Sequence, residues 1–461
     1  MLRMGGQDAA FLYGETPSWH MHVSCLMILD PSDAPEFSFE RLRQVTIDRL
    51  PSLPQFRWKV VDVPFGLDRP GWIEETHFDP DFHIRRIAVP PAGGTEEVGD
   101  LVGRLASYQI DRRRPLWEMW VIEGLADGKV AVLFKIHHSI IDGSTGTGIA
   151  EIMLDTTPDP PRLVHDITRS LADRPIPGVP EMLVKGLWNM FFATPVRVAQ
   201  FTGQTLRQGI AALGVVRHSP MPSAPYSAPR SSLNGPLTPR RSFASARVGI
   251  ERVRAIRRKH DVKLNDVVLA LCAGALREHL AARGDLPRSP LIAQCPVSLR
   301  SEEDHEVGNK VGSMFASLAT DIDDPLQRLQ AIHQSTMSAK EMQHALSVHR
   351  IMGLTDATPP ALVGLAARTY SAAGLDRAAP PPVNLVISNV PGPPVPLFMA
   401  GAKLEAMYPM GPLLFDMGLN ITVLSYCDHI DFGFQACPDL VADPQVLADR
   451  IEAALDELES A

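Results

Sequence analysis

Two adjacent histidines, His137 and His138, are the residues of this chain whose types and spacing point most directly to chemistry. After three intervening residues come Asp142 and Gly143. An imidazole titrates near neutral pH and can accept a proton from an alcohol when its other ring nitrogen is held in the right tautomer. An aspartate followed by a glycine suits the loop that would fix this geometry. The pattern therefore favours a general base.

Other chemistries fit this motif less well. Successive side chains on a strand point to opposite faces, so the two histidines cannot bind one metal ion while the strand persists. The nearest candidate for a nucleophile elbow, Ser144, has the wrong glycine spacing. The glycine-rich run 143–148 lacks both the G-x-G-x-x-G order and the lysine of a phosphate-binding loop. A metal site and a nucleophilic serine are therefore less favoured than a general base.

The segments around the motif predict the elements that position it. Residues 128–136 (GKVAVLFKI) combine a turn signal with a β-rich apolar run and predict a strand, and residues 146–154 predict a helix. In the second half, residues 250–260 and 266–282 predict helices, and residues 291–297 predict a strand. This mixture of strands and helices indicates an α/β or α+β fold.

Proline divides the chain into parts. The sequence has 461 residues and 41 prolines, many of which lie between residues 156 and 240. Because proline interrupts helices and central strands, residues 156–240 predict a connector with a few short helices. A single core stops growing at about 250–300 residues, which also favours two lobes. We expect an N-terminal lobe over residues 1–155 and a C-terminal lobe over residues 241–461.

Composition excludes several classes of protein. With 45% hydrophobic and 21% charged residues, the chain has the composition of a folded protein, and its net charge of −9 disfavours nucleic acid as a partner. The five cysteines are widely spaced without a C-x-x-C pair, which argues against a disulfide framework and fits a reducing compartment. The first residues show no secretory signal. We therefore expect a cytoplasmic protein.

The connector contains one apolar stretch, residues 182–210, whose longest uncharged run is 186–196. This run is shorter than the roughly 18–20 apolar residues that a membrane span needs. Trp188, Phe191 and Phe192 lie beside basic residues, as in an amphipathic segment at a membrane interface. The alternative is a helix that docks on the protein by its aromatic face.

The histidine motif matches H-H-x-x-x-D-G of the coenzyme A-dependent acyltransferase superfamily, which includes chloramphenicol acetyltransferase and peptide-synthetase condensation domains. The whole chain resembles one branch of it, the bacterial wax ester synthase/acyl-CoA:diacylglycerol acyltransferase family, of the mycobacterial triacylglycerol synthase type. The matching segments are QDAAFL (7–12), MHV (21–23), RPLWEMWVIEGL (114–125), SLNGP (232–236), NDV (265–267), PVSLR (296–300), SNVPGP (388–393) and LSY (424–426).

This resemblance implies two chloramphenicol-acetyltransferase-like lobes with mixed sheets flanked by helices and an active site at their interface. It implies that His138 is the catalytic base, with His137 and Gly143 beside it in the motif. Asp142 falls on a structural carboxylate that pairs with an arginine in relatives, and Arg300 is our candidate partner.

Further site residues also follow from the resemblance. Asn265 and Asp266 fall on a second motif whose asparagine lies near the reacting groups. The Asn265 amide, or backbone N–H groups near Asp142 and Gly143, could stabilise the oxyanion. Two marker segments are expected to contact substrate, or alternatively to form packing turns near the active-site channel. Their residues are Pro115, Leu116, Trp117, Ser388 and Asn389.

The activity that the resemblance implies is transfer of a long-chain acyl group from acyl-CoA to diacylglycerol, with no acyl-enzyme and no cofactor besides the co-substrate. Long-chain alcohols, which would give wax esters, are alternative acceptors. Condensation chemistry and a catalytically silent acyl-CoA-binding or lipid-binding protein are further alternatives. We expect peripheral association with the inner membrane or with lipid droplets.

Overall fold

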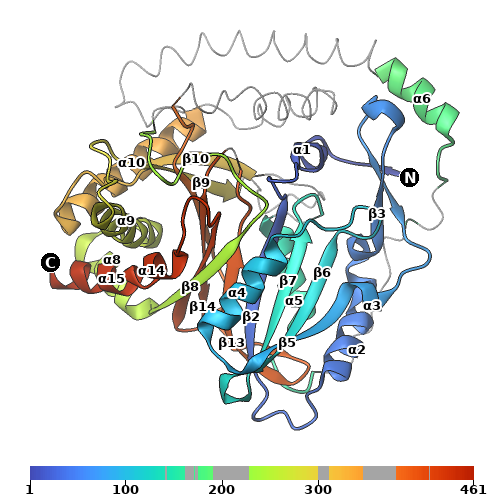
Figure 1. The fold of residues 1–461 in the computed structure, drawn as a ribbon, viewed down its shortest axis with the longest axis horizontal. Coiled ribbons are helices and arrows are strands. Elements are labelled where there is room, and N and C mark those ends of the chain that lie inside the picture. The colour runs from blue at the N-terminus through green and yellow to red at the C-terminus, as the bar shows by residue number, and fades with distance from the viewer. Residues whose placement is uncertain are drawn as a thin grey trace.

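The computed structural model describes residues 1–140, 143–160, 171, 175–189, 228–298, 311–345, 380–414 and 416–461. Within these ranges the chain forms two six-stranded mixed sheets and one small three-stranded sheet, with helices packed on them (Figure 1). The first large sheet has the order β12-β13-β2-β7-β6-β5, and the second has the order β10-β9-β11-β14-β15-β8. The expected fold class, two sheet-rich lobes flanked by helices, is confirmed.

The first lobe is built around four strands of the first large sheet. They are β2 (His22–Asp30), β5 (Ile84–Gly93), β6 (Trp117–Leu125) and β7 (Val130–His137). The helices α2 (Phe39–Arg49) and α5 (Gly143–Met153) cover one face, and α4 (Thr95–Ala106) covers the other. Both faces of β7 are buried, which explains its nearly continuous apolar sequence. The predictions of a strand over 128–136 and of a helix over 146–154 are confirmed within a few residues.

The described part of the first lobe has six further short elements outside these four strands and three helices. They are β1 (Leu2–Arg3), α1 (Gly6–Gly14), β3 (Trp58–Val61), β4 (Gly71–Glu74), α3 (Pro80–His83) and α6 (Val179–Trp188). The strands β1, β4 and β3 make the small sheet. Helix α6 is the described helix of the proline-rich connector, and it packs on the 3-10 turn Pro64–Gly66 between β3 and β4.

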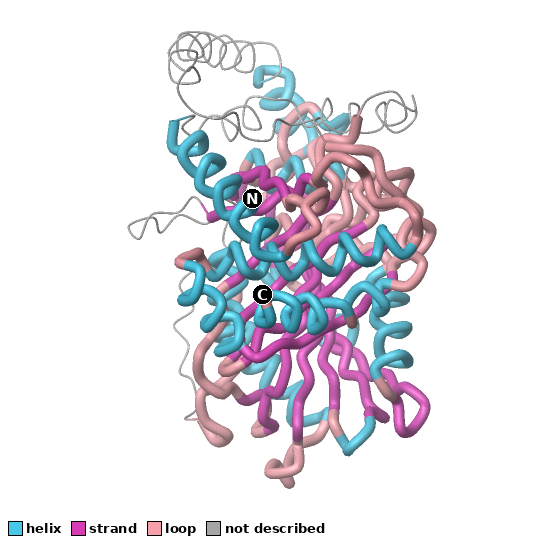
Figure 2. Tube along the Cα trace, turned by 90° about the vertical axis from the view of Figure 1, so that its left-hand side faces the viewer, coloured by secondary structure: helices cyan, strands magenta, loops and turns pink. Residues whose placement is uncertain are grey.

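The second lobe has helices on one side of its sheet. Its strands are β8 (Ser242–Gly249), β9 (Ile292–Ser298), β10 (Val311–Ser317), β11 (Leu385–Val390), β14 (Leu419–Tyr426) and β15 (His429–Ala436). Its helices are α8 (Ile250–His260), α9 (Leu264–Ala282), α10 (Pro325–Ala345), α14 (Pro444–Ala448) and α15 (Arg450–Ser460). Figure 2 shows helices of this lobe, nearest the viewer, covering the strands behind them. The predicted helices over 250–260 and 266–282 and the predicted strand over 291–297 are confirmed.

Two strands from the C-terminal part of the chain complete the first sheet. After β11, the chain forms β12 (Phe398–Met399) and β13 (Ala402–Met410), and β13 pairs antiparallel with β2. The strand β13 also lies against β15: a Cβ atom on Gly433 would come 1.9 Å from the Pro409 carbonyl oxygen, so only glycine fits there. The expected division at residues 155 and 241 stays a prediction, and sheet membership does not follow it.

A second junction between the lobes lies where α4 meets the start of β8. The Arg241 backbone N–H donates to Ser107 Oγ at 2.8 Å, and the Arg241 guanidinium donates to the Ser18 carbonyl oxygen at 2.5 Å. Phe243 of β8 belongs to the same apolar cluster as Val98 and Val102 of α4. Hydrogen bonds and a common apolar cluster therefore join the two lobes at this junction.

No helix in the described part of the chain is long and apolar enough to span a membrane. Of the apolar stretch 182–210, the structure describes only the part up to Asn189. Phe191 and Phe192 therefore lie outside the described residues.

Candidate active site

The histidine motif begins on the last residue of β7. His137 pairs with His22 of β2, and its backbone N–H donates to the Leu116 carbonyl oxygen at 2.9 Å. The backbone N–H of His138 donates to the Met21 carbonyl oxygen at 2.7 Å. Two of the matching segments, MHV and RPLWEMWVIEGL, therefore fix the backbone of the motif from either side.

The first histidine is locked inside the protein. His137 is 1% exposed, and the Ser139 backbone N–H donates to its Nδ1 at 3.1 Å. Since Nδ1 accepts, the ring proton lies on Nε2, which is 3.9 Å from Glu15 Oε2. Burial lowers the pKa of His137 well below its ordinary value, and the positive charge of Arg112 adds to this effect. His137 is therefore buried and held in one orientation, and its place among the catalytic residues stays a prediction.

The second histidine has a different environment. Side chains alternate along β7 and into the residue that follows it, so the His138 ring lies on the other side of the chain from His137. It is half-buried and packs on Phe11 of α1, with ring centroids 4.3 Å apart. Of the two histidines, His138 is thus the more exposed.

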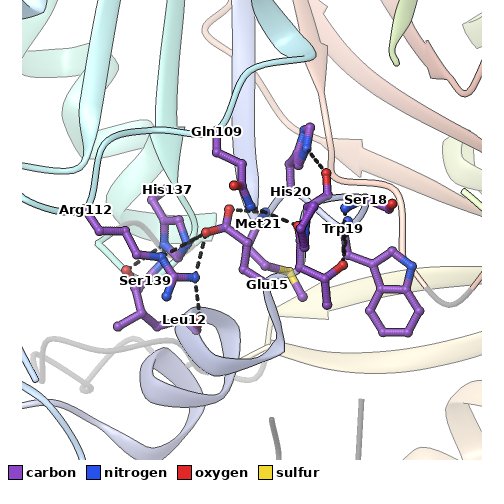
Figure 3. Close-up of polar contacts among 12 residues, drawn as sticks. Leu12, Glu15, Ser18, Trp19, His20, Met21, Gln109, Arg112, His137 and Ser139 are labelled. Atoms are coloured by element: carbon purple, nitrogen blue, oxygen red, sulfur yellow. Dashed lines mark hydrogen bonds and ion pairs between the residues drawn. The ribbon is translucent and has the colours of Figure 1, made fainter. Parts of the chain in front are cut away.

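A buried carboxylate, that of Glu15, lies beside His137 (Figure 3). The Glu15 side chain is 2% exposed, and its Oε2 accepts from Arg112 Nη2 at 2.6 Å and from Nε at 3.0 Å. Its Oε1 accepts from the Met21 backbone N–H at 3.1 Å. Arg112 also donates to the Leu12 carbonyl oxygen at 2.5 Å. Glu15 thereby ties the end of α1, the entry to β2 and the loop before β6 into one unit.

The C-terminal end of α4 lies over a polar cluster on the same face as His137. Lys135 is fully buried, and its ammonium donates to the carbonyl oxygens of Leu105 and Tyr108. Its Nζ is 3.7 Å from Glu118 Oε2. Burial lowers the pKa of Lys135 to about 8, against the opposing effect of Glu118. His22 Nε2 lies 3.1 Å from the carbonyl oxygen of Ala106, the last residue of α4, and is a hydrogen-bond partner for it.

The Pro115, Leu116 and Trp117 segment lies in the core of the first lobe. All three residues are buried, and Trp117 Nε1 donates to the Phe56 carbonyl oxygen at 2.8 Å. The Trp117 ring stacks on His83, with centroids 4.7 Å apart. These contacts support the packing alternative, whereas direct contact of this segment with substrate stays a prediction.

In the second lobe, the structure brings two predicted site residues together. Asn389 Nδ2, on β11, donates to Asn265 Oδ1, in the first turn of α9, at 3.2 Å. Both side chains are half-buried. Because the Asn265 oxygen is engaged in this way, its amide N–H groups are oriented away from Asn389.

Asp266, the neighbour of Asn265, has its carboxylate fully engaged by the protein. It is 1% exposed and accepts from the Lys263 backbone N–H at 2.9 Å and from Thr336 Oγ1 at 2.7 Å. His333 Nδ1 lies 2.6 Å from its Oδ2. Asp266 therefore closes the N-terminus of α9 and fastens this helix to α10, while a contact with substrate stays a prediction.

Two of the matching segments, SNVPGP and LSY, pack on each other. Ser388 lies half-buried on β11, and three residues beyond Asn389 the Gly392 backbone N–H donates to Ser425 Oγ at 3.1 Å. A Cβ atom on Gly392 would come 2.0 Å from the Ser425 carbonyl oxygen. The close approach explains why the SNVPGP segment needs a glycine opposite LSY.

Part of the predicted site lies outside the described residues, namely Asp142 and Arg300. Their pairing stays a prediction. Gly143 is the first residue of α5, so the backbone N–H groups of a helix N-terminus follow the motif directly. No group of three His, Cys, Asp or Glu side chains that could hold a metal ion occurs in the part of the chain that the structure describes.

Comparison with known families identifies the chain. The model of the wax ester synthase/diacylglycerol acyltransferase catalytic domain matches residues 4–268, and that of the WS/DGAT C-terminal domain matches residues 307–459. The protein belongs to the wax ester synthase/diacylglycerol acyltransferase family. It is an acyltransferase, as the resemblance of its motifs implied.

Relatives and solved structures agree with this family. A Mycobacterium tuberculosis protein named as a diacylglycerol O-acyltransferase is 36% identical over 99% of this chain and 90% of its own length. The wax ester synthase/diacylglycerol acyltransferase from Marinobacter aquaeolei VT8 is 30% identical, with a TM-score of 0.72 over 100% of this chain and 99% of that one. The first condensation domain of the calcium-dependent antibiotic synthetase, at 15% identity and a TM-score of 0.51 over 99% of this chain and 95% of that one, shares the fold.

Two residues that support the acyltransferase site were not singled out from the sequence. Glu15 follows the QDAAFL segment, and Arg112 precedes RPLW, so both lie next to family segments. They are 97 residues apart in the chain, and no local pattern links them. Two signals were available in the sequence. Glu15 is an acidic residue directly after an apolar helix, and Arg112 lies in a run of arginines before a buried strand.

Proposed function

We propose that this acyltransferase moves a long-chain fatty acyl group from acyl-CoA to diacylglycerol, forming triacylglycerol, with His138 as the general base. Family membership supplies the reaction class, and the mycobacterial relatives carry the name diacylglycerol O-acyltransferase. The observation that carries the assignment of the base is the contrast between the two histidines. His137 is locked, neutral and 1% exposed, whereas His138 is half-buried beside Phe11.

The reaction follows from the chemistry of the two substrates. A hydroxyl group is a weak nucleophile at neutral pH, so His138 takes its proton while the oxygen attacks the thioester carbonyl carbon. The new carbon–oxygen bond gives a tetrahedral intermediate with a negatively charged oxygen. When this intermediate collapses, the carbon–sulfur bond breaks, and the coenzyme A sulfur leaves with the proton from the imidazolium. The base is thereby restored, and no acyl-enzyme forms.

The negative oxygen needs hydrogen-bond donors. In our proposal, the Asn265 amide supplies one of them, because Asn389 holds the Asn265 oxygen and so directs the amide N–H groups elsewhere. The backbone N–H groups at the start of α5, beginning at Gly143, are the other candidates. Each such donor stabilises a transition state by about 3–4 kcal/mol in enzymes where it has been removed.

Long-chain alcohols are the second candidate acceptor. The name of the Marinobacter neighbour includes both wax ester synthase and diacylglycerol acyltransferase. The same base and donors serve either alcohol, so the acceptor preference is set by the channel that leads to His138. Diacylglycerol is our first choice because the mycobacterial relatives, at 36% identity, carry that name.

The test is a side-by-side assay with palmitoyl-CoA. Thiol release is measured with no acceptor, with dioleoylglycerol and with hexadecanol, and the lipid products are separated and identified. We expect thiol release that depends on dioleoylglycerol and yields triacylglycerol. Faster release with hexadecanol would make the protein a wax ester synthase. No acceptor-dependent release from either alcohol would leave a binding protein and overturn the proposal.

We also propose that the enzyme meets a lipid surface through α6 and the turn beneath it. Six large apolar side chains there are at least 44% exposed: Phe65, Ile176, Val179, Val184, Leu187 and Trp188. The opposite side of α6 is docked, because a Cβ on Gly186 would come 2.8 Å from Leu67 Cβ and Asn189 Nδ2 donates to Asp68 Oδ2 at 2.7 Å. An exposed apolar patch with tryptophan and a nearby lysine is typical of segments that lie at a membrane interface. Insoluble acceptors would reach the enzyme from such a surface.

A further inference from the structure

The first turn of α9 carries Asn265 and is closed by the carboxylate of the next residue, Asp266. Asp266 Oδ2 accepts from the Lys263 backbone N–H at 2.9 Å, and this N–H belongs to the residue that precedes the helix. The Asp266 side chain is only 1% exposed. Because an ionised group is costly to bury without hydrogen-bond partners, this carboxylate needs donors from elsewhere in the fold.

Helix α10 supplies these donors. Thr336 Oγ1 donates to Asp266 Oδ1 at 2.7 Å, and His333 Nδ1 lies 2.6 Å from Asp266 Oδ2. A carboxylate only accepts hydrogen bonds, so Nδ1 carries the ring proton of His333 and donates it. Hydrogen bonds to a charged acceptor are about twice as strong as those between neutral groups. The shortest of the three hydrogen bonds to this carboxylate therefore comes from His333.

The His333 ring serves Asp266 and not the core of the lobe. Its neighbours on α10, Leu329 and Ile332, are fully buried and anchor that helix in the core, whereas the His333 side chain is 25% exposed. Within the part of the chain that the structure describes, the ring has no polar contact besides Asp266. A ring that is partly exposed and bonded in this way is a link from a firmly packed helix to the first turn of α9.

Asn265 is held by two elements that meet at this turn. Asn389 of β11 donates to its Oδ1 at 3.2 Å, and Asp266 fastens the backbone beside it to α10. The direction of the Asn265 amide N–H groups depends on both attachments. In enzymes, a displacement of about 1 Å at a reacting group can lower the rate a hundredfold. The link from His333 to Asp266 is therefore in a position to affect catalysis.

We propose that His333 is a positioning residue for acyl transfer, because its hydrogen bond to Asp266 sets the place of the Asn265 amide. The proposal rests on the function proposed above, in which Asn265 donates to the negative oxygen. His333 itself does not touch the reacting atoms. Since that oxygen becomes charged only during the reaction, loss of the link should slow the chemical step and leave binding of acyl-CoA nearly unchanged.

The experiment replaces His333 with three residues and measures turnover of palmitoyl-CoA with dioleoylglycerol. We expect His333→Ala to lower kcat about tenfold and to leave the KM for palmitoyl-CoA within about twofold. His333→Asn places an amide N–H where Nδ1 lies and should keep kcat within about twofold of the wild type. His333→Gln places its amide one bond farther from the backbone, so it should resemble the alanine variant even if His333→Ala does not fold.

The control is Arg277→Ala, which removes another link between α9 and the start of α10. Arg277 donates to the Thr320 carbonyl oxygen and to Asp323 Oδ1, both at 2.7 Å. It lies about 18 Å along α9 from Asn265. We expect this variant to melt at a lower temperature and to keep the kcat of the wild type. A fall in kcat confined to His333→Ala and His333→Gln would separate positioning from general stability.

Three results would overturn the proposal. They are an unchanged kcat in His333→Ala, an equal loss in His333→Asn, which would assign the effect to Nε2, and an equal loss in Arg277→Ala. If the wild-type enzyme transfers the acyl group to neither alcohol, the proposed function fails, and amide hydrogen exchange over residues 263–268 still tests the link. Faster exchange in His333→Ala than in His333→Asn and the wild type would then support it, whereas equal exchange in all three would overturn it.

Discussion

His137 and His138 show how strongly position along a strand decides what a residue can do. They are adjacent in sequence, yet one ring is held by Ser139 on the α4 side and the other packs on Phe11. Burial lowers the pKa of the first well below its ordinary value, whereas the second is the half-buried one that we propose as the base. The same alternation is the reason why we do not expect the two histidines to bind one metal ion together.

Replacing His138 with alanine is expected to lower acyl transfer at least a hundredfold, because general bases contribute factors of about 10²–10⁴. The side chain is only half-buried, so the fold should persist. Turnover with palmitoyl-CoA and dioleoylglycerol, together with circular dichroism of the same sample, checks both statements. Near-normal turnover by a correctly folded variant would remove His138 from the mechanism.

Glu15→Gln tests the buried carboxylate that joins α1, β2 and the loop before β6. The amide has the same shape but leaves Arg112 without its negative partner, and we expect a loss of about 2–3 kcal/mol in the free energy of unfolding. The matched control is Asp111→Asn, which removes the partner of the exposed Arg113 and should cost less than about 1 kcal/mol. Equal effects in chemical denaturation would contradict the structural role of Glu15.

His83 should make the protein less stable in acid. Burial lowers its pKa to about 4, partly opposed by the hydrogen bond to the Trp117 carbonyl oxygen. Between pH 6.5 and pH 4 the unfolded chain binds a proton that the folded chain excludes, so stability is present above pH 6.5 and falls as the pH drops toward 4. The full effect is at most roughly 3 kcal/mol.

The variant His83→Gln isolates this contribution, because the amide can still donate to Trp117 but does not titrate. We expect the difference in unfolding free energy between pH 7 and pH 5 to be smaller in the variant by about 2 kcal/mol. Denaturant titrations at the two pH values supply the comparison. A pH dependence identical to that of the wild type would show that His83 protonates equally in both states.

At the scale of elements, α6 is the helix whose two sides differ most in what they contact. Met182 and Gly186 face the protein, whereas Val184 and Leu187 face outward. Trp188 is 62% exposed, so the aromatic side is not the docked side, at least over the described part of the stretch. Helix α6 is therefore the element on which the lipid-surface proposal depends.

The double variant Val184→Asp, Leu187→Asp should reduce co-sedimentation with phosphatidylglycerol vesicles at least tenfold, because each apolar side chain that enters the interface is worth about 1.5–3 kcal/mol. Val446→Asp, at an exposed valine on α14, is the control and should bind like the wild type. Unchanged binding by the α6 variant would place the lipid contact elsewhere on the protein.

Elements with a strong local pattern were predictable from the sequence. The apolar run before the histidines gave β7, the basic amphipathic segment gave α8, and the continuous apolar segment gave α9 because that helix is buried almost all round. The pairing of β13 with β2 was not predictable, because partners such as Tyr408 and Leu26 are far apart in the sequence and no local pattern links them. The Glu15–Arg112 pair and the buried Lys135 under α4 were missed for the same reason.

At the scale of the whole molecule, the two lobes meet through a contact that tolerates no side chain. Gly433→Ala should lower the melting temperature sharply, since its Cβ would lie 1.9 Å from the Pro409 carbonyl oxygen and force β13 and β15 apart. The control Gly148→Ala, with nothing within 4 Å of the new Cβ and a position inside α5, should be neutral or slightly stabilising. Equal melting temperatures for the two variants would contradict this contact.

The strand order of the first sheet has a consequence for synthesis on the ribosome. Until residues 398–410 have been made, β2 is the outer strand of its sheet, with an apolar sequence and a row of unpaired backbone groups. During most of translation the nascent chain therefore exposes an edge that can pair with other chains. The yield of folded enzyme would therefore depend on whether β2 is shielded, for example by a chaperone, until β13 has been made and pairs with it.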